Sequence, residues 1–411
     1  MTVPKLRFKE FDEDWNLSSL ANISSIITGN TPSTSNREYY DGEFLFVSPA
    51  DIQENRYIEK TKTTLTANGF SKCRHIPENS VLFVCIGSTI GKVAQNKVIC
   101  ATNQQINAVI PKKGYSSDFL YLQLERLAPK IKLNAGVQAV PLINKTEFGK
   151  TLLNTPIYIE QTKIAAFLST VDEKISQLSQ KHELLSQYKQ GMMQKLFNQK
   201  IRFKADDGSE FEKWEETTLG KVTKYFKGYA FKSESYKENG IRIIRVSDLG
   251  KDSIKYDNDA IYLEESESPN YENWVIKKGD IVITTVGSKP HLIDSAVGRP
   301  IYIKNDNEGL LNQNLLVLRP IDQSVAAYFI FSQLLGKKYL THIETIQRGN
   351  ANQSNITVKD LQEFKVFNTL KEEQTKIANF LSAIDQKIEV VAQQIEQAKQ
   401  WKKGLLQQMF V

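Results

Sequence analysis

The segment Glu160–Phe197, EQTKIAAFLSTVDEKISQLSQKHELLSQYKQGMMQKLF, decides the fold because the chain contains a second copy of it. The copy, Glu373–Phe410, reads EQTKIANFLSAIDQKIEVVAQQIEQAKQWKKGLLQQMF, and about half of the aligned positions are identical. A period of roughly two hundred residues is far longer than the twenty to fifty of a solenoid repeat. The sequence therefore predicts one unit, a globular domain followed by a helix, that occurs twice with approximate twofold symmetry.

Both copies place apolar residues at alternating intervals of three and four positions, as at Ile164, Leu168 and Val171. This spacing is typical of left-handed coiled-coil packing. No proline interrupts residues 162–195, and the other positions are mostly Gln, Lys, Glu and Ser. We therefore predict two long helices, each with one apolar stripe, that lie antiparallel against each other. At 1.5 Å per residue, each would be a rod of roughly 57 Å that holds two globular units apart.

Three residues depart from the expected pattern of these helices. His182 falls on the apolar stripe, where we expect a packed histidine or a register-setting polar residue rather than a pH switch. Gly191 and Gly404 lie in tails that otherwise read as helical, where glycine costs about 1 kcal/mol relative to alanine. Close approach of another helix, a break before a docking segment and neutral surface drift are alternative explanations for the two glycines.

Composition bounds the class of protein. The 411 residues suffice for two or three domains, and the net charge of +6 permits a nucleic-acid partner without demonstrating one. Cys73, Cys85 and Cys100 show no CxxC spacing, so we expect buried free thiols in a reducing compartment. Because no apolar leader opens the chain and no uncharged apolar stretch approaches 18 residues, we expect a cytoplasmic protein without a membrane span.

The duplication extends into the globular parts. Each opens with Arg-Phe-Lys and a tryptophan, at Arg7–Lys9 with Trp15 and at Arg202–Lys204 with Trp214. A glycine turn, short strands, a buried apolar strand, an Asn-Gln pair, a helix-like segment and a closing strand then follow in the same order. In the first unit these are Thr28–Pro32, Phe44–Ser48, Val81–Ile86, Asn103–Ile110, Ser117–Leu133 and Leu152–Ile159, and in the second Lys227–Gly228, Ile241–Ser247, Ile281–Val286, Asn312–Leu318, Ser324–Leu340 and Phe364–Phe367.

This order predicts an α/β protein with two mixed α/β domains joined by the two long helices. The expected boundaries are 1–159 for the first domain, 160–200 for the first helix, 201–372 for the second domain and 373–411 for the second helix. Between these landmarks the domains diverge almost completely, as residues 253–274 do from residues 56–75. One scaffold with two different surfaces suits a protein that reads two different things at a set separation.

The sequence lacks the residue patterns of an enzyme. The nearest to a phosphate loop, Gly87–Val93, needs one more residue between its glycines and a Ser or Thr after its lysine. The four histidines have no paired spacing that suits a zinc site, and neither GxGxxG nor GxSxG occurs. We therefore expect a binding or adaptor protein with no catalytic residues and no metal site of its own.

The repeated motif EQ-x-x-IA-x-FLS-x-x-D-x-K-I at Glu160–Ile175 and Glu373–Ile388 resembles that of type I restriction-modification specificity subunits. The tails YKQGMMQKLF and WKKGLLQQMF and the Gly-x-Thr-Pro turn at Gly29–Pro32 add to this resemblance, which covers essentially the whole chain. The second unit departs from it, because Tyr229-Ala230-Phe231 replaces Thr-Pro after Gly228.

The resemblance implies two target recognition domains, each of which reads one half of a bipartite site in double-stranded DNA. It also implies that the helices fix the gap between the half-sites and dock two methyltransferase subunits. In such assemblies the methyltransferase subunits hold S-adenosylmethionine and methylate adenine N6, while separate motor and nuclease subunits use ATP and Mg. No cofactor is expected in this chain.

Base reading requires Arg, Lys, Asn, Gln, Ser and Thr side chains on loops that face base edges. In the first unit we expect DNA contacts from Thr28, Asn30, Thr31, Ser33, Arg74, Ser88, Thr89, Lys92, Asn103 and Gln104. In the second we expect them from Lys227, Lys232, Arg245, Ser288, Lys289, His291, Arg299, Asn312, Gln313, Arg348 and Asn350. Alternative roles are stable turns, hydrogen bonds to the backbone and solvated surface charges.

Two other functions remain open on the sequence alone. One is a coiled-coil scaffold whose two domains bind proteins. The other is a specificity subunit for a partner in which methyltransferase and nuclease are fused in one chain.

Overall fold

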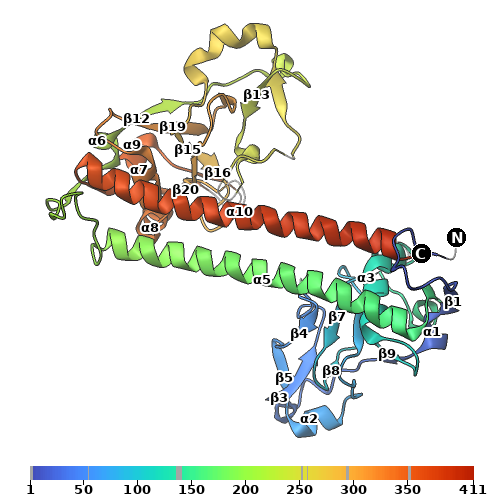
Figure 1. Ribbon diagram of the computed structural model, residues 1–411. Helices are drawn as coiled ribbons and strands as arrows, with labels where there is room; N and C mark the ends of the chain where they lie inside the picture. Colours follow the sequence, from blue (N-terminus) through green and yellow to red (C-terminus); the bar gives the residue numbers. More distant parts are fainter. Residues whose placement is uncertain are drawn as a thin grey trace. The chain divides into compact units, whose positions relative to one another are not determined.

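The computed structural model describes residues 3–53, 55–135, 141–250, 253–256, 258–292, 296–349 and 353–411. Asn350, a predicted DNA contact, lies outside them. The chain forms two compact units: unit 1 comprises Met1–His182 and Val391–Val411, and unit 2 comprises Glu183–Val390. Each unit therefore takes part of both long helices, α5 (Tyr158–Phe197) and α10 (Lys371–Met409) (Figure 1).

The predicted long helices are confirmed, with ends two or three residues from the expected bounds. Helix α5 begins at Tyr158, two positions before the repeated stretch, because Pro156 ends the preceding strand. It ends at Phe197, after which Gln199 adopts a left-handed backbone with φ of 54° and donates its N–H to the carbonyl of Leu196. Such a left-handed residue stops a helix by turning the chain away from its axis.

Unit 1 contains a five-stranded sheet in the order β2-β9-β6-β7-β4 and a three-stranded sheet in the order β5-β3-β8. The strands of the larger sheet are β2 (Ser24–Thr28), β9 (Ile106–Pro111), β6 (Val81–Val84), β7 (Val93–Asn96) and β4 (Tyr57–Ile58). Those of the smaller sheet are β5 (Thr63–Leu65), β3 (Tyr40–Val47) and β8 (Ala101–Thr102). A separate antiparallel pair joins β1 (Asn16–Ser19) to β10 (Leu152–Thr155).

The helices of unit 1 surround these sheets. They are α1 (Leu20–Ile23), η1 (Arg37–Tyr39), α2 (Ala67–Ser71), α3 (Ser117–Leu133) and α4 (Lys145–Gly149). Helix α3 has the predicted bounds, and the Ser116 side chain caps its first turn by accepting a hydrogen bond from the Phe119 N–H. All four residues of β6 are buried, as its continuous apolar sequence predicted.

Unit 2 repeats this arrangement. Its main sheet runs β12-β19-β15-β17 and its smaller sheet β14-β13-β18. The strands of the two sheets are β12 (Thr223–Lys227), β19 (Leu315–Pro320), β15 (Ile281–Thr284), β17 (Pro300–Tyr302), β14 (Ile261–Leu263), β13 (Ile241–Ile244) and β18 (Leu310–Leu311). A third sheet contains β16 (Val286–Gly287), β21 (Ser354–Asn355) and β20 (Arg348–Gly349), and β11 (Glu215–Thr218) pairs with β22 (Lys365–Asn368).

The helices of unit 2 include the predicted helical segment, which is interrupted, and further short helices that were not predicted. They are α6 (Leu219–Val222), η2 (Ser233–Ser235), η3 (Val246–Asp248), η4 (Glu265–Trp274), α7 (Ala327–Leu334), α8 (Lys337–Ile346) and α9 (Val358–Gln362). The single helix-like segment expected at Ser324–Leu340 is two helices, because Gly336 adopts an extended backbone between α7 and α8. Within the described residues, no helix is long and apolar enough to cross a membrane.

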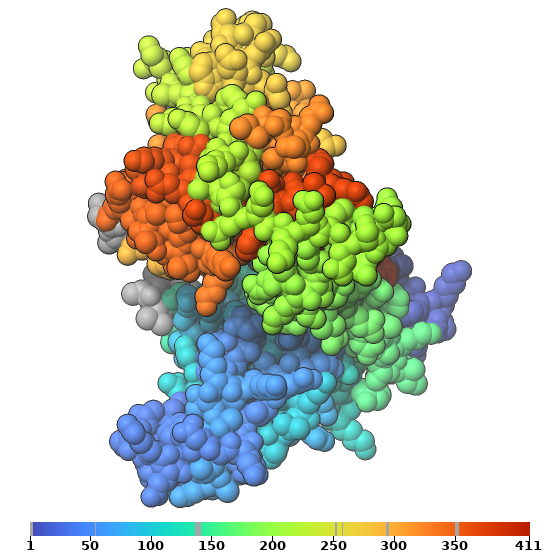
Figure 2. Space-filling model, turned by 90° about the vertical axis from the view of Figure 1, so that its left-hand side faces the viewer, coloured from blue at the N-terminus to red at the C-terminus, as the bar shows by residue number. Residues whose placement is uncertain are grey.

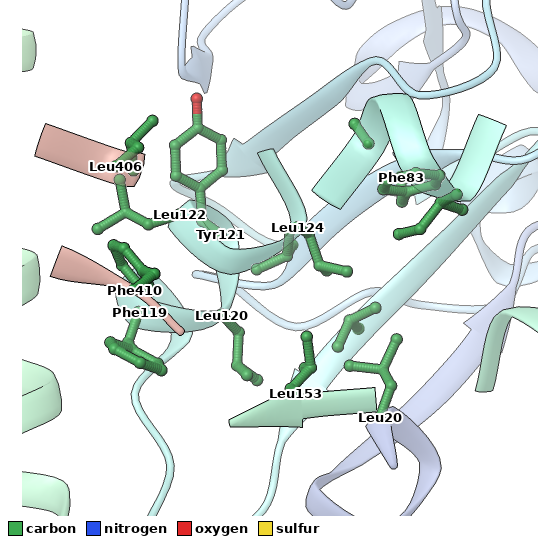
Figure 3. Close-up of a cluster of buried hydrophobic side chains, with 14 of the residues drawn as sticks. Leu20, Phe83, Phe119, Leu120, Tyr121, Leu122, Leu124, Leu153, Leu406 and Phe410 are labelled. Atoms are coloured by element: carbon green, nitrogen blue, oxygen red, sulfur yellow. The ribbon is translucent and has the colours of Figure 1, made fainter. Parts of the chain in front are cut away.

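The end of each long helix completes a globular core. In unit 1, Leu406 of α10 and Phe410, the residue after its end, pack against Leu122 and Phe119 of α3 (Figure 3). The Phe410 ring centroid lies 6.1 Å from that of Trp15 in unit 1, and the Phe197 centroid lies 6.2 Å from that of Trp214 in unit 2. In each unit the start of one long helix shares a core with the end of the other, so the helices pair antiparallel there, as predicted.

The repeated Glu-Gln pair at the start of the sequence motif has a structural role. Glu160 accepts hydrogen bonds from Arg7, and Glu373 accepts the equivalent bonds from Arg202, so each glutamate anchors the opening segment of its unit. These carboxylates raise the pKa of both arginines through hydrogen bonds that outweigh the effect of burial. The following Gln161 accepts a hydrogen bond from the Ser116 N–H, at the start of α3. The motif therefore joins each long helix to its globular core.

Candidate nucleic-acid interface

In unit 1 the predicted glycine turn lies against the Asn-Gln turn. A Cβ atom on Gly29 would lie 2.2 Å from the carbonyl oxygen of Thr102, so only glycine fits there. The Gly29 N–H donates to the Ile106 carbonyl at 3.1 Å, and the Thr31 hydroxyl bonds Gln104 Oε1 at 2.7 Å. Two predicted contact segments that are more than seventy residues apart in sequence therefore form one surface.

Residues after α2 hold this turn in place. Arg74 Nη1 donates to the Thr28 carbonyl at 2.7 Å, and the Arg74 N–H donates to Asn30 Oδ1 at 2.8 Å. Asn30 Nδ2 in turn donates to the Lys72 carbonyl at 3.0 Å. Arg74 is exposed although one of its amino groups is used in this way. The arginine fork retains further donors for a ligand.

The loop after β6 reaches the same edge. Gln105 Nε2 donates to the Ile86 carbonyl at 3.3 Å, which places the β6–β7 turn beside the Asn-Gln turn. Ser88 is exposed in that turn, and Thr89 is half-buried. Thr28, Asn30, Thr31, Arg74, Ser88, Thr89, Asn103 and Gln104 are thus gathered at one edge of unit 1.

Unit 2 reproduces the close approach despite its lack of Thr-Pro. A Cβ atom on Gly228 would lie 1.8 Å from the Asn312 carbonyl oxygen. The Tyr229 N–H donates to the Leu311 carbonyl at 2.9 Å, and the Gln313 N–H donates to the Tyr229 carbonyl at 2.8 Å. Lys227, Lys232 and Gln313 are exposed around this turn. The resemblance between the two turns therefore lies in backbone geometry rather than in the Thr-Pro sequence.

The remaining predicted residues of unit 2 lie on neighbouring loops. The Thr285 N–H donates to the Asn314 carbonyl at 2.7 Å, which brings the segment containing Ser288, Lys289 and the exposed His291 next to the Asn-Gln turn. Arg348 pairs with Asn355 of β21, which also pairs with β16. Arg348 is exposed and forms an ion pair with Asp360 at 3.0 Å.

Several predicted contact residues are buried or use their polar groups in bonds to other residues of this chain. Lys92 Nζ donates to the Ile52 carbonyl at 2.7 Å, and Arg299 Nη2 donates to the Leu292 carbonyl at 2.9 Å. Arg245 forms an ion pair with the fully buried Asp248 at 3.2 Å. Asn312 is only 6% exposed, and Ser33 bonds the Ser35 hydroxyl at 2.8 Å. These bonds show structural roles for the groups that make them.

Sequence reasoning did not select Tyr229 as a contact residue. It is 37% exposed and immediately follows the glycine of the unit 2 turn. The signal was present, because Tyr229-Ala230-Phe231 is the place where the second unit departs from the Thr-Pro pattern. The selection was based on side chains that hydrogen-bond to base edges, and these do not usually include aromatic residues.

The titratable groups near these turns do not suggest covalent or metal chemistry. Burial raises the pKa of the Cys73 thiol, which donates weakly to the Asn30 carbonyl. A raised pKa favours the neutral thiol, which lowers its reactivity at physiological pH. In the parts of the chain that the structure describes, no group of three His, Cys, Asp or Glu residues is placed to hold a metal ion. The arrangement presents hydrogen-bond donors, acceptors and positive charge, which suits binding of a polar, negatively charged ligand.

Comparison with known families gives a match over most of the chain. The family described as the type I restriction modification DNA specificity domain matches residues 12–187 and again residues 211–400. The chain belongs to this family. The two matched ranges coincide with the duplication seen in the sequence, and each contains one of the glycine turns described above.

Individual relatives agree with this assignment. The MjaVIII specificity subunit of a type I restriction enzyme from Methanocaldococcus jannaschii is 24% identical over 402 residues, covering 96% of this chain and 91% of that protein. The HindI specificity subunit from Haemophilus influenzae is 31% identical over 196 residues, which is 46% of this chain and 42% of that protein.

The fold also matches a solved structure. The type I restriction-modification S subunit from M. genitalium superposes with a TM-score of 0.62 and 16% identity, covering 100% of this chain and 99% of that one. The predicted fold, with two mixed α/β domains and two long helices, is therefore that of the specificity family.

Proposed function

We propose that this chain is the DNA specificity subunit of a type I restriction-modification complex. Each recognition domain reads one half of a bipartite target in double-stranded DNA. The observation that carries this proposal is the duplicated edge, where a glycine turn lies against an Asn-Gln turn at Gly29 and Asn103 and again at Gly228 and Asn312. Two equivalent pairs of turns that carry different side chains suit two half-sites of different sequence.

The long helices are proposed to set the spacing between the half-sites. Their role is supported by uninterrupted lengths of 40 and 39 residues. Helices of this kind resist bending because every interior peptide group is hydrogen-bonded along the axis.

The partners proposed are two methyltransferase subunits, which dock on the helices, and the motor and nuclease subunits of the complex. This chain is proposed to be non-catalytic and to hold no cofactor. S-adenosylmethionine would be bound by the methyltransferase subunits, and ATP and Mg by the motor and nuclease subunits. Because its proposed target is DNA, we place the chain in the cytoplasm.

The first experiment is methylation sequencing of DNA from a host that expresses this chain with its methyltransferase. The proposal expects one bipartite motif with a fixed gap. DNA methylated at sites without two separated halves would contradict it. Binding of the purified complex to duplex DNA at increasing salt tests the scaffold alternative, since a protein scaffold predicts no salt-sensitive DNA affinity.

A second experiment tests the spacer. Deleting Gln177–Glu183 together with Val391–Gln397 removes one heptad from each helix, and both the Lys402–Asp172 and Lys189–Asp385 ion pairs retain their antiparallel register. The deletion shortens each rod by about 10 Å, or about three base pairs of B-DNA. The preferred gap should become shorter by that amount, or binding should be lost because the half-sites then face different directions. An unchanged gap would exclude the helices as the spacer.

A further inference from the structure

The two units hold the glycine turn with the corresponding element but with different chemistry. In unit 1 the element that follows β5 is α2, and the residues after it hold the turn by hydrogen bonds from Arg74 and to Lys72. In unit 2 the element that follows β14 is η4, and it supplies two aromatic rings in place of these polar bonds. This element belongs to the segment in which the two sequences diverge most.

Tyr229 lies on a base of aromatic rings. Its ring centroid is 4.7 Å from that of Trp274, 5.2 Å from that of Tyr271 and 5.0 Å from that of Phe231. Phe231 is only 7% exposed, whereas Tyr229 is 37% exposed. The yellow atoms of η4 lie at the outer surface of unit 2 in Figure 2. The ring of Tyr229 is therefore held by neighbours on one side while another side remains open to solvent.

The position of Tyr229 in the turn places it among the proposed base readers. It occupies the position after the glycine, which is Asn30 in unit 1. Its own backbone bonds the residues before and after Asn312, and the exposed Lys227 and Gln313 lie beside it. Where unit 1 presents an amide that is already hydrogen-bonded, unit 2 presents an apolar ring.

The apolar face of a fixed ring has a natural partner in the major groove. The 5-methyl group of thymine is the apolar feature of that groove and is contacted by methyl and aromatic side chains. A ring that its neighbours already hold in place loses little conformational freedom on binding. Removing one buried methyl group should weaken binding about fourfold.

We propose that Tyr229 is a specificity-determining residue that contacts a thymine methyl group in the half-site read by unit 2. This inference rests on the proposed function and adds the chemical group that one loop recognises. Every half-site that contains an adenine contains a thymine on the opposite strand, so a candidate methyl group is present wherever adenine is the methylated base.

The test uses the full complex of this chain with its methyltransferase subunits and a duplex that carries its bipartite target. Each thymine is replaced singly by deoxyuridine, which removes only the methyl group. In the wild-type complex, at least one replacement should weaken binding about fourfold. Tyr229→Phe should keep this response because the ring remains. Tyr229→Asn, which introduces the unit 1 residue, should abolish the response in that half-site and leave the other half-site unchanged.

The outcomes separate this inference from the proposed function. If the wild-type complex shows no preference for a bipartite site, the proposed function is wrong. If it binds the site but responds to no deoxyuridine replacement, the role of Tyr229 is wrong, whatever the variants do. The role is also wrong if Tyr229→Asn retains the wild-type response. Tyr158→Asn, at an exposed tyrosine at the start of α5, is the matched control, and it should leave any Tyr229-dependent response intact.

Discussion

Lys402 of α10 lies 2.8 Å from Asp172 of α5 inside unit 1, and Lys402 also contacts Glu125 at 2.7 Å. Unit 2 contains the duplicate of this pair, in which Lys189 lies 2.6 Å from Asp385. Between the two pairs, the position on α5 rises by 17 residues and the position on α10 falls by 17 residues, as expected for antiparallel helices. Burial lowers the pKa of Lys402, but the two carboxylates more than offset this and raise it overall.

Replacing Lys402 with methionine should destabilise unit 1. Two poorly solvated carboxylates, Glu125 and Asp172, would lose their shared cation. We expect a loss of about 2 kcal/mol in the free energy of unfolding, below the usual value for a fully buried pair because both carboxylates retain some exposure. Urea unfolding measures this loss, with Lys403→Met at the adjacent exposed position as control. Equal effects at both positions would contradict a structural role for Lys402.

Glu373→Ala should be more damaging than any surface glutamate change. The fully buried carboxylate accepts hydrogen bonds from Arg202, from Trp214 Nε1 at 2.7 Å and from the Thr369 hydroxyl. Its removal takes the acceptor from the indole N–H and the carboxylate from the Arg202 guanidinium, which keeps its bond to the Glu212 carbonyl, at a cost of about 3 kcal/mol. Glu372→Ala, at an exposed position that contacts Lys376, should change stability by less than about 0.5 kcal/mol. Thermal unfolding of both variants tests the difference.

Gly228→Ala should impair reading of one half-site. The new methyl group would collide with the Asn312 carbonyl, so the turn must move. We expect about tenfold weaker binding to the bipartite site, or about 1.4 kcal/mol, with specificity relaxed in one half only. Gly220→Ala is the control in the same unit, because the atoms nearest to its methyl group belong to the Gln362 side chain at 3.0 Å or more rather than to a backbone carbonyl. Methylation sequencing with each variant would show a relaxed half-site for Gly228→Ala alone.

Gly191→Ala should stabilise the isolated chain. Helix α5 continues through Gly191, and apart from the neighbouring turns of α5 itself no atom of the described residues lies within 4 Å of the place where a Cβ would stand. At Gly191 the described part of the chain therefore shows neither close approach of another helix nor a helix break, two of the explanations offered by the sequence. The gain should be about 1 kcal/mol, because alanine favours the helix over glycine. A stabilised chain that binds methyltransferase subunits more weakly would show that a partner approaches this position.

The three cysteines should differ in reactivity. Burial raises the pKa of both Cys85 and Cys100 to about 12, so at pH 8 only about one thiol in ten thousand is ionised. Neither should be alkylated by iodoacetamide within the time that labels free cysteine. Half-buried Cys73, whose pKa is also raised by burial, should react slowly. Peptide mass spectrometry with and without urea measures this, and rapid labelling of Cys100 in the folded chain would contradict its burial.

Local patterns predicted the secondary structure well because they depend on residues close in sequence. The apolar stripe from Ile164 to Leu196 specifies a long helix, and the uninterrupted run Val81–Val84 specifies a strand buried on both faces. The sequence did not predict the break between α7 and α8 at Gly336, because apolar residues continue on both sides of it.

The candidate interface was predictable only in part. Gly29 and Asn103 were both selected from sequence, but their contact depends on the pairing of β2 with β9, about eighty residues away. The sequence does not show whether the Arg245 side chain faces solvent or Asp248. Only the structure shows their ion pair. Two of the rings under Tyr229, those of Tyr271 and Trp274, come from η4, whose sequence differs from that of the corresponding α2 in unit 1.

The sequence by itself determined that one unit is used twice and that each copy ends in a long amphipathic helix, because repetition and periodicity are properties of the chain. Tertiary structure decided which surfaces the helix ends complete: Phe410 packs on Trp15, and Phe197 packs on Trp214. It also decided which polar side chains remain available at the turns. Both depend on contacts between distant residues, since a side chain becomes buried, paired or exposed only when the rest of the fold surrounds it.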